Sequence, residues 1–332
     1  MENEKHIKRQ LTKFGFYGLL KNLRFFDPFM LYYLVQSGID LTGIGFLIAI
    51  REVMIYVFEV PSGVIADKLG KRNELVLCFL FYIGAFILFF IGGSYYIFVL
   101  AYVLFGLGEA FRSGTHKAMI MDFLEYHNIK DDKAKVYGKT RSYSLIGSSI
   151  SSLIAIGLVL YLPNLSLLFL VSIIPYILDL VLILTYPDYL NIREESFVTV
   201  KEFMYSMFKL LYDTLLIKKT RRLLLDSSLY NAIYKTIKDY VQPILESLML
   251  GVIVITILDS DENVEVILGI TYALIFIISS FASRYSYILV NKFKRDSILN
   301  ISWILSMMVY ILLSLFIESL YMVVLFFTLI YV

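Results

Sequence analysis

Nine apolar segments, each long enough to cross a lipid bilayer, follow one another along this chain of 332 residues. A helix needs about 20 mostly apolar residues to span the hydrocarbon core. A soluble core cannot cover so many such runs, so the sequence predicts an all-α polytopic helix bundle in a lipid bilayer. The expected spans are Phe14–Gly38, Leu41–Ala66, Leu75–Gly93, Tyr95–Met121, Thr140–Leu162, Leu165–Tyr186, Leu223–Leu258, Val264–Val290 and Ile298–Ile317.

A tenth apolar run begins at Leu320 and reaches the last residue, Val332. A run of this length, at about 1.5 Å per residue, falls short of a core about 30 Å thick. We therefore expect the chain to stop inside a helix and to be incomplete for transport.

Basic residues orient the expected bundle, because cytoplasmic loops carry an excess of Lys and Arg. They gather in the N-terminal tail and in every second connection. The opposite connections, such as Ser37–Thr42 and Gly92–Tyr95, contain none. This alternation predicts a cytoplasmic N-terminus in a plasma-membrane protein. The basic stretches are Lys5–Lys13, Lys68–Arg72, Lys130–Arg141, Arg193–Arg222 and Lys292–Arg295.

The composition excludes several classes of protein. The formal net charge of +2 gives no reason to expect a nucleic-acid partner. A single cysteine, Cys78, permits no intrachain disulfide, and the histidines lack metal-ligand spacing. Sequence patterns of zinc proteases, serine hydrolases and phosphate-cradling loops are missing, so we expect no enzyme, no metal and no cofactor.

The connection between the sixth and seventh spans divides the chain. Its apolar residues between Val200 and Leu215 have helical spacing, which predicts an amphipathic helix on the membrane face; an irregular linker is the alternative. The expected units are a six-helix half over 1–186, a cytoplasmic linker over 187–222 and a second half over 223–332 that ends in its fourth helix.

Residues 63–72, after the second span, read GVIADKLGKR. This resembles the G-x-L-A-D-R-x-G-R-R signature of the major facilitator superfamily in the slot where that family places it. The runs RFFDPF from Arg24 and EVPSG from Glu59 are similar to a bacterial branch. The fifth span lacks the proline of the proton-antiporter signature. The resemblance implies two pseudo-symmetric six-helix halves, the second incomplete here, and the same analogy implies a monomer.

The resemblance also implies a cytoplasmic gate. Asp67 would hold a helix N-terminus of the other half, and the basic residues after it would pair with nearby acidic helix ends, such as Asp122. These charges would latch the cytoplasmic side and separate when the halves rock. A basic loop with an incidental Asp is the alternative, and Glu59 could carry protons rather than brace the gate. The gate set is Glu59, Gly63, Asp67, Gly70, Lys71, Arg72 and Asp122.

Charged residues inside the spans predict a polar interior, because a charge at membrane depth costs about 2.5–3.5 kcal/mol. Three spans carry opposite charges three or four residues apart, on one helical face. The family resemblance places those spans, the first, fourth and seventh, around the central cavity. The pairs are either substrate and proton sites or self-neutralised structural pairs: Arg24 with Asp27, Glu109 with Arg112, and Lys235 with Asp239.

Pro28 and Pro243 interrupt the first and seventh spans, as hinges of rocking helices or as passive kinks. The expected function is secondary transport of a small organic solute by alternating access, first as proton-coupled efflux by an antiporter. Uptake of a small charged metabolite and a non-transporting membrane sensor or scaffold on the same fold are the alternatives.

Overall fold

The computed structural model describes residues 2–129, 133–191, 260–292 and 295–331, together with isolated residues between 205 and 248. The elements it assigns there are helical. In chain order they are α1 (Glu2–Leu20), η1 (Asp27–Phe29), α2 (Met30–Gln36), α3 (Leu41–Leu69), α4 (Lys71–Ile91), α5 (Tyr95–Arg112), α6 (Thr115–Tyr126), α7 (Lys133–Tyr161), α8 (Leu167–Leu184), η3 (Asp188–Leu190), α11 (Ser260–Lys292), α12 (Arg295–Leu315) and α13 (Leu320–Tyr331).

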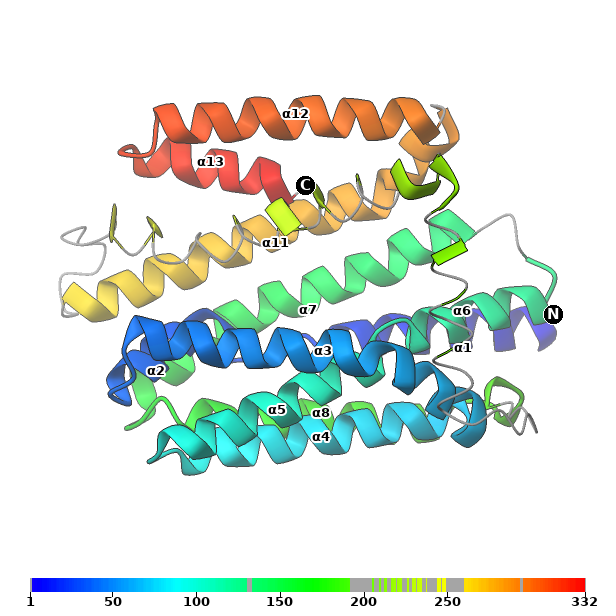
Figure 1. Ribbon diagram of the computed structural model, residues 1–332, viewed down its shortest axis with the longest axis horizontal. Coiled ribbons are helices and arrows are strands. Elements are labelled where there is room, and N and C mark those ends of the chain that lie inside the picture. Colours follow the sequence, from blue (N-terminus) through cyan, green and yellow to red (C-terminus); the bar gives the residue numbers. More distant parts are fainter. Residues whose placement is uncertain are drawn as a thin grey trace.

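The long helices run side by side as a bundle (Figure 1). Helices α1 to α8 form one group, and α11, α12 and α13 lie beside it, with α7 next to α11. The start of α1, the end of α3, the start of α7 and the end of α11 carry or adjoin basic stretches, and they lie at the end where the N-terminus is marked. We call this the basic end; the connections without basic residues lie at the other end.

Six helices among the described residues are long and apolar enough to cross a membrane. They correspond to the expected second, third, fourth, fifth, sixth and eighth spans. The apolar part of α12 covers only Asn300–Leu315, and α13 is shorter still. The expected seventh span, with Lys235, Asp239 and Pro243, lies outside the described residues except for isolated positions, as does the expected amphipathic helix.

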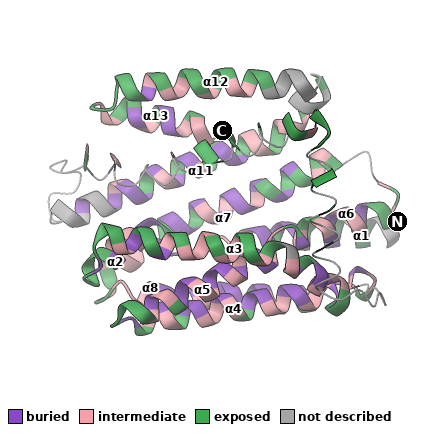
Figure 2. Ribbon diagram, in the orientation of Figure 1, coloured by how far each residue is buried: buried purple, intermediate pink, exposed green. Residues whose placement is uncertain are grey.

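The core of the first group is aromatic. On α4, Phe79, Tyr82, Phe86 and Phe89 recur every three or four residues and are fully buried. Phe89 stacks on Phe169 of α8, with ring centroids 5.0 Å apart. Large apolar residues remain exposed on the outer faces, where α12 is mostly green and pink in Figure 2. This inside-out pattern is the one that lipid requires.

The first span departs from the prediction of one helix over Phe14–Gly38. Helix α1 ends at Leu20, and helical structure resumes only at Asp27. Pro28 stands in the first turn of η1, where its missing N–H costs no hydrogen bond. Arg24 therefore lies in a non-helical segment and does not share a helix face with Asp27, contrary to the prediction.

Small residues let α7 contact helices on both of its sides. A Cβ on Gly147 would lie 2.4 Å from the carbonyl oxygen of Leu19 in α1. Toward α11, the Ser142 hydroxyl lies 2.7 Å from the Ser280 hydroxyl. Close helix contact through Gly and Ser is typical of membrane bundles. The small residues of α7 thus pack against α1 of the first group on one side and against α11 of the second group on the other.

Replacing Gly147 with alanine should destabilise the bundle, because the added methyl group has backbone atoms in its way. Overpacking of this kind costs roughly 1–3 kcal/mol. Gly157 on the same helix has no atom within 4 Å of an added Cβ. Thermal unfolding of Gly147→Ala and Gly157→Ala should therefore show a lower Tm for the first variant only. Equal Tm values would contradict this account of the α1–α7 contact.

Candidate functional site

The non-helical segment between α1 and η1 is held by side chains of α8. The Tyr176 hydroxyl donates to the carbonyl oxygen of Lys21 at 2.9 Å, and the backbone N–H of Phe25 donates to the Ser172 hydroxyl at 3.1 Å. Backbone without helical hydrogen bonds is tolerated at membrane depth only where protein groups or a water-filled cavity satisfy it. The α8 contacts meet this need and fix the position of Arg24.

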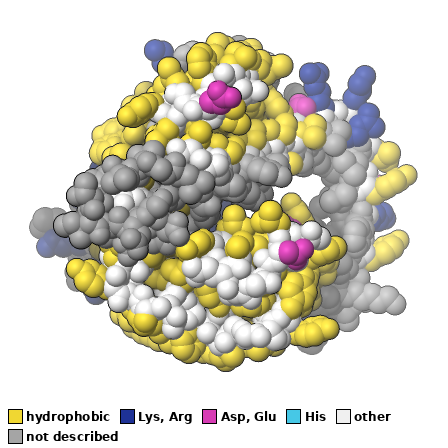
Figure 3. Space-filling view, turned by 90° about the vertical axis from the view of Figure 1, so that its left-hand side faces the viewer, with side chains coloured by type: hydrophobic (Ala, Val, Ile, Leu, Met, Phe, Trp, Pro, Cys, Tyr) yellow, Lys and Arg dark blue, Asp and Glu magenta, His cyan; other side chains and the backbone are white. Residues whose placement is uncertain are grey.

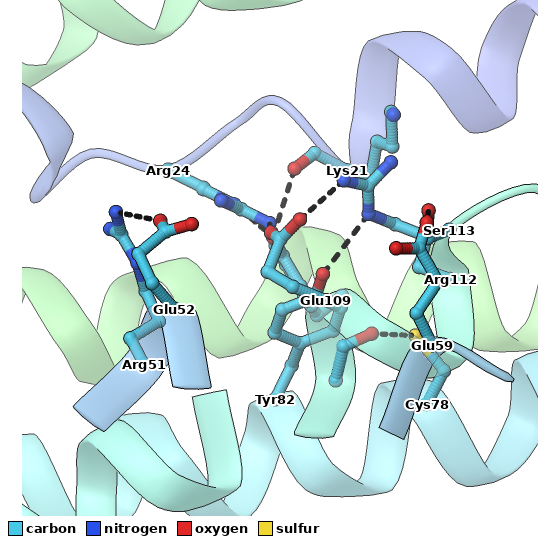
Figure 4. Close-up of polar contacts among 12 residues, drawn as sticks. Lys21, Arg24, Arg51, Glu52, Glu59, Cys78, Tyr82, Glu109, Arg112 and Ser113 are labelled. Carbon is cyan, nitrogen blue, oxygen red and sulfur yellow. Dashed lines mark hydrogen bonds and ion pairs between the residues drawn. The ribbon is translucent and has the colours of Figure 1, made fainter. Parts of the chain in front are cut away.

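Arg24 and Arg112 hold one carboxylate between them. The Arg24 guanidinium lies 2.7 Å from one oxygen of Glu109, and Arg112 pairs with the other oxygen. The side chains of Arg24 and Glu109 are only 15% and 17% exposed. The predicted pairing of Glu109 with Arg112 is thus present, and Arg24 joins it (Figure 4).

Aromatic side chains surround this charged group. The Arg24 guanidinium carbon lies 5.0 Å from the ring centre of Phe105 and 5.1 Å from that of Tyr82. The Tyr82 hydroxyl also accepts a hydrogen bond from Arg112 at 3.1 Å. Electron-rich ring faces attract cations. They compensate for part of the water that the guanidinium groups lose, and they hold the network in a rigid arrangement.

A cavity of about 450 Å³ lies against this network. Most of its wall comes from the first group of helices, including the three serines Ser148, Ser151 and Ser152 of α7. Tyr272 and Phe276 of α11 and Tyr331 of α13 complete it from the second group. In the view from the end opposite the basic end, a hollow opens between the two groups (Figure 3). Its charged lining residues are Arg24, Asp27, Arg51, Glu52 and Glu109.

Three of the predicted substrate or proton residues, Arg24, Asp27 and Glu109, line this cavity. Arg112 stands behind Glu109 and contacts the cavity only through it. Lys235 and Asp239 lie outside the described residues. The first and fourth spans therefore meet at one cavity, and the roles of these residues remain a prediction.

The sequence reasoning missed Arg51 and Glu52 of α3 as site residues. Arg51 donates to Glu52 at 2.8 Å, and both line the cavity. The Arg51 Nε and the hydroxyl of Ser151, another lining residue, are buried without a hydrogen-bond partner among the described residues. Two adjacent charges in an apolar span were the available signal, but adjacent residues do not share a helix face and escape a search for i, i+3 pairs.

The signature loop at the basic end is built around Gly70. This residue has φ +89°, and its N–H closes α3 on the carbonyl of Ala66 at 2.8 Å. A Cβ there would lie 2.3 Å from Oδ1 of Asn191. That same oxygen accepts from the N–H of Arg72 at 3.0 Å. Asn191, which follows the sixth span, thus packs directly against the Gly70 turn and is hydrogen-bonded to it.

The basic residues of the signature pair within the first group of helices. Lys71 contacts Asp122 of α6 at 2.5 Å, which is the expected partner, and Arg72 contacts Asp188 of η3 at 2.7 Å. The prediction that these pairs latch the two halves together is therefore wrong for Lys71 and Arg72. Because both partners belong to the first half, rigid rocking of the halves would leave these pairs intact; they brace that half.

The other gate residues have separate surroundings. The Ser113 hydroxyl donates to Glu59 at 2.7 Å, which links α3 to the end of α5. Gly63 has no atom within 4 Å of an added Cβ among the described residues, so the expected close packing at this glycine is not seen. Asp67 is partly buried near the end of α3, and its contact with another half remains a prediction.

Neutralising Glu109 should destabilise the protein, because Glu109→Gln leaves two guanidinium groups facing each other. Breaking a buried ion pair from one side costs roughly 3–5 kcal/mol. Glu52→Gln is the matched control: its side chain and that of Arg51 are 26% and 28% exposed, and Glu52 pairs with one arginine. Thermal unfolding should give a clearly lower Tm for Glu109→Gln. A larger loss in Glu52→Gln would overturn the central place given to Glu109.

Replacing Gly70 with alanine should also lower the Tm, whereas Gly63→Ala should not. Alanine in the left-handed region costs roughly 1–2 kcal/mol, and the added methyl group would displace Asn191. Both glycines belong to the same signature, so the pair separates a local backbone requirement from general sensitivity of the loop. Equal losses in the two variants would contradict the role assigned to the Gly70 turn.

Comparison with known proteins places these features in a family. Residues 17–332 match the family model of the Major Facilitator Superfamily. An uncharacterized MFS-type transporter of Bacillus subtilis (strain 168), YxaM, is 26% identical over 227 residues, which cover 67% of this chain and 55% of that protein. The chain thus spans about half the length of this curated relative.

Two solved transporters share the fold at low identity. A mutant of the nucleoside transporter NupG has a TM-score of 0.72 and 15% identity, over 98% of this chain and 79% of that one. A POT family transporter in complex with 5-aminolevulinic acid has a TM-score of 0.67 and 16% identity, over 97% and 80%. With the family model covering nearly the whole sequence, this chain belongs to the Major Facilitator Superfamily.

Proposed function

We propose that this protein is a secondary active transporter that moves a small charged or zwitterionic organic solute by alternating access, in exchange for protons. One observation carries the proposal: a cavity of about 450 Å³, at membrane depth and between two groups of helices, is lined by side chains of both charges. Charges inside a membrane protein generally mark a substrate or ion pathway. A cavity of this size suits a small molecule.

The cavity offers matched partners for such a solute. The Nε of Arg51 and the hydroxyl of Ser151, which lack a hydrogen-bond partner in the part of the chain that the structure describes, suit a carboxylate or another acceptor group. The carboxylates of Asp27 and Glu52, on the same wall, suit an ammonium group. Tyr272 and Phe276 offer apolar and aromatic surface. The likeness to a nucleoside transporter and to a transporter solved with 5-aminolevulinic acid supports a small organic solute.

The two groups of helices supply the movement. Helices α7 and α11 meet through small and hydroxylated residues; for example, the Ser149 hydroxyl donates to the Ala273 carbonyl at 3.0 Å. Such contacts are smooth and individually weak, so one half can tilt against the other at modest cost. With the basic end at the cytoplasmic side of the plasma membrane, alternate tilting would open the cavity to each side in turn. A monomer suffices for this cycle.

Efflux against protons is the direction we propose first, with uptake of a charged metabolite as the alternative. Both use the same cavity and differ in which side the solute enters. A sensor or scaffold on the same fold would need neither a matched cavity nor movement. Binding and flux therefore have to be measured separately.

Binding can be tested through thermal stability of the purified protein with a panel of small amino acids, amines, carboxylates and nucleosides at two pH values. A ligand at a hundredfold over its Kd stabilises the folded state by about 2.7 kcal/mol. One chemical class should raise the Tm. The shift should disappear in Arg51→Gln and Asp27→Asn and persist in Asp188→Asn, whose side chain is 92% exposed at the basic end.

Flux of the stabilising compound is then measured in liposomes with an imposed pH gradient. Transport that follows the gradient supports proton coupling, and its direction separates efflux from uptake. Binding without flux would favour the sensor, and stabilisation that survives both cavity substitutions would place the binding site elsewhere.

A further inference from the structure

A second carboxylate lies in the membrane region of the first half, away from the cavity. Asp179 of α8 is completely buried, and neither of its oxygens has a hydrogen-bond partner among the described residues. The hydroxyl of Tyr17 in α1, which is 1% exposed, likewise has none. A buried carboxylate with no partner costs several kcal/mol if it is ionised. By contrast, Glu109, the charged carboxylate of the same group of helices, has an arginine on each of its two oxygens.

Titratable groups from each neighbouring element face this position. Lys21, directly after α1, is the cation whose charge acts on Asp179, and its ammonium lies 5.7 Å from the ring centre of Tyr17 rather than in an ion pair with the carboxylate. Helices α5 and α7 contribute, at greater remove, Arg112 and Arg141, whose charges act on Lys21, and α4 contributes the titratable thiol of Cys78 on the side of Tyr17.

Polar side chains that can carry a proton lie between this position and the basic end. The ring of His116 in α6 stacks on Tyr17, with centroids 3.6 Å apart. Its Nε2 lies 3.3 Å from the hydroxyl of Tyr186, which follows α8. Tyr186 comes two residues after the end of α8, whose C-terminal end faces the basic end.

In the opposite direction, Asp179 is linked to the cavity. Tyr176 lies one turn before it on the same face of α8. The Tyr176 hydroxyl donates to the carbonyl oxygen of Lys21 and accepts from Nε of Arg24, which lines the cavity. If Lys21 moved toward Asp179, the Tyr176 hydroxyl bonded to its backbone would shift, and so would the Arg24 side chain bonded to that hydroxyl.

We propose that Asp179 is a proton-binding site of the first half, distinct from the solute cavity and coupled to it through Lys21, Tyr176 and Arg24. In the conformation seen here, the carboxyl group carries the proton. On release, the proton leaves toward the basic end, where His116 and Tyr186 lie within hydrogen-bond distance of each other, and the Lys21 ammonium approaches the carboxylate and replaces the lost charge. Asp179 would then be the proton-coupling site of the proposed transporter. Its role in transport rests on the proposed function, whereas its binding of a proton does not.

Protonation of Asp179 can be measured without any solute. Infrared difference spectra of the purified chain, taken from about pH 5 to about pH 9, should show a protonated-carboxyl band that disappears as pH rises. Asp179→Asn should lack this component, and Asp188→Asn should retain it. An unchanged band in Asp179→Asn would overturn the proposal.

Two further variants guard against a merely structural role. Because asparagine resembles the protonated carboxyl group, Asp179→Asn should fold and should lose less stability than the unaltered protein as pH rises. Lys21→Gln removes the replacement cation, so loss of the band should move upward by about one pH unit or more. No movement in Lys21→Gln would exclude the exchange of proton for Lys21.

Transport assays separate this proposal from the proposed function. With a transported solute, Asp179→Asn should keep solute exchange across the membrane and lose accumulation driven by a pH gradient. Loss of exchange as well, with normal folding, would overturn the separate placement of the proton site. A protein that shows the Asp179 titration but moves no solute would refute the transport function and leave the proton site standing.

Discussion

The two ion pairs of Glu109 are what allow the first span to be broken inside a membrane. Between Leu20 and Asp27 the chain is not helical, and this gap delivers Arg24 to the cavity wall. A lone arginine there would face a cost of several kcal/mol. Glu109 removes that cost, the aromatic rings around it exclude water, and α8 satisfies the freed backbone. The shape of the cavity depends on this arrangement.

Helix α7 is the second constraint, because it is shared by the two groups of helices. Its glycines and serines permit approach to α1 on one side and to α11 on the other. Large side chains would interlock and fix a single arrangement, whereas small ones leave flat surfaces that can slide. The same residues give the cavity its hydroxyl groups through Ser148 and Ser151. Packing and solute contact thus come from one short run of sequence.

Six of the nine expected spans appear as membrane-length helices among the described residues, since apolar length is a property that a bilayer imposes on any chain. The signature also predicted the pairing of Lys71 with Asp122. Tertiary detail did not follow. Arg24 has Asp27 three residues away, yet its partner Glu109 comes from another span, because the helix ends before Arg24. Arg51, Glu52 and Asp179 became notable only through burial and missing partners, which no sequence pattern displays.

Glu109 and Asp179, two carboxylates of the first half, differ in a way that suits two tasks. Glu109 is neutralised on both oxygens, so a proton would gain little there, and its position sets the shape of the solute site. Asp179 has no such partner, so its charge can change when a proton or Lys21 arrives. Arg24, the cation that pairs with Glu109, is connected to Lys21, the cation near Asp179, through the Tyr176 hydroxyl and the Lys21 carbonyl oxygen. A short rigid link of this kind converts a change of charge into a displacement of Arg24. The braces of Lys71 and Arg72 then keep the first half rigid, so that such a displacement acts on the contact with the second half.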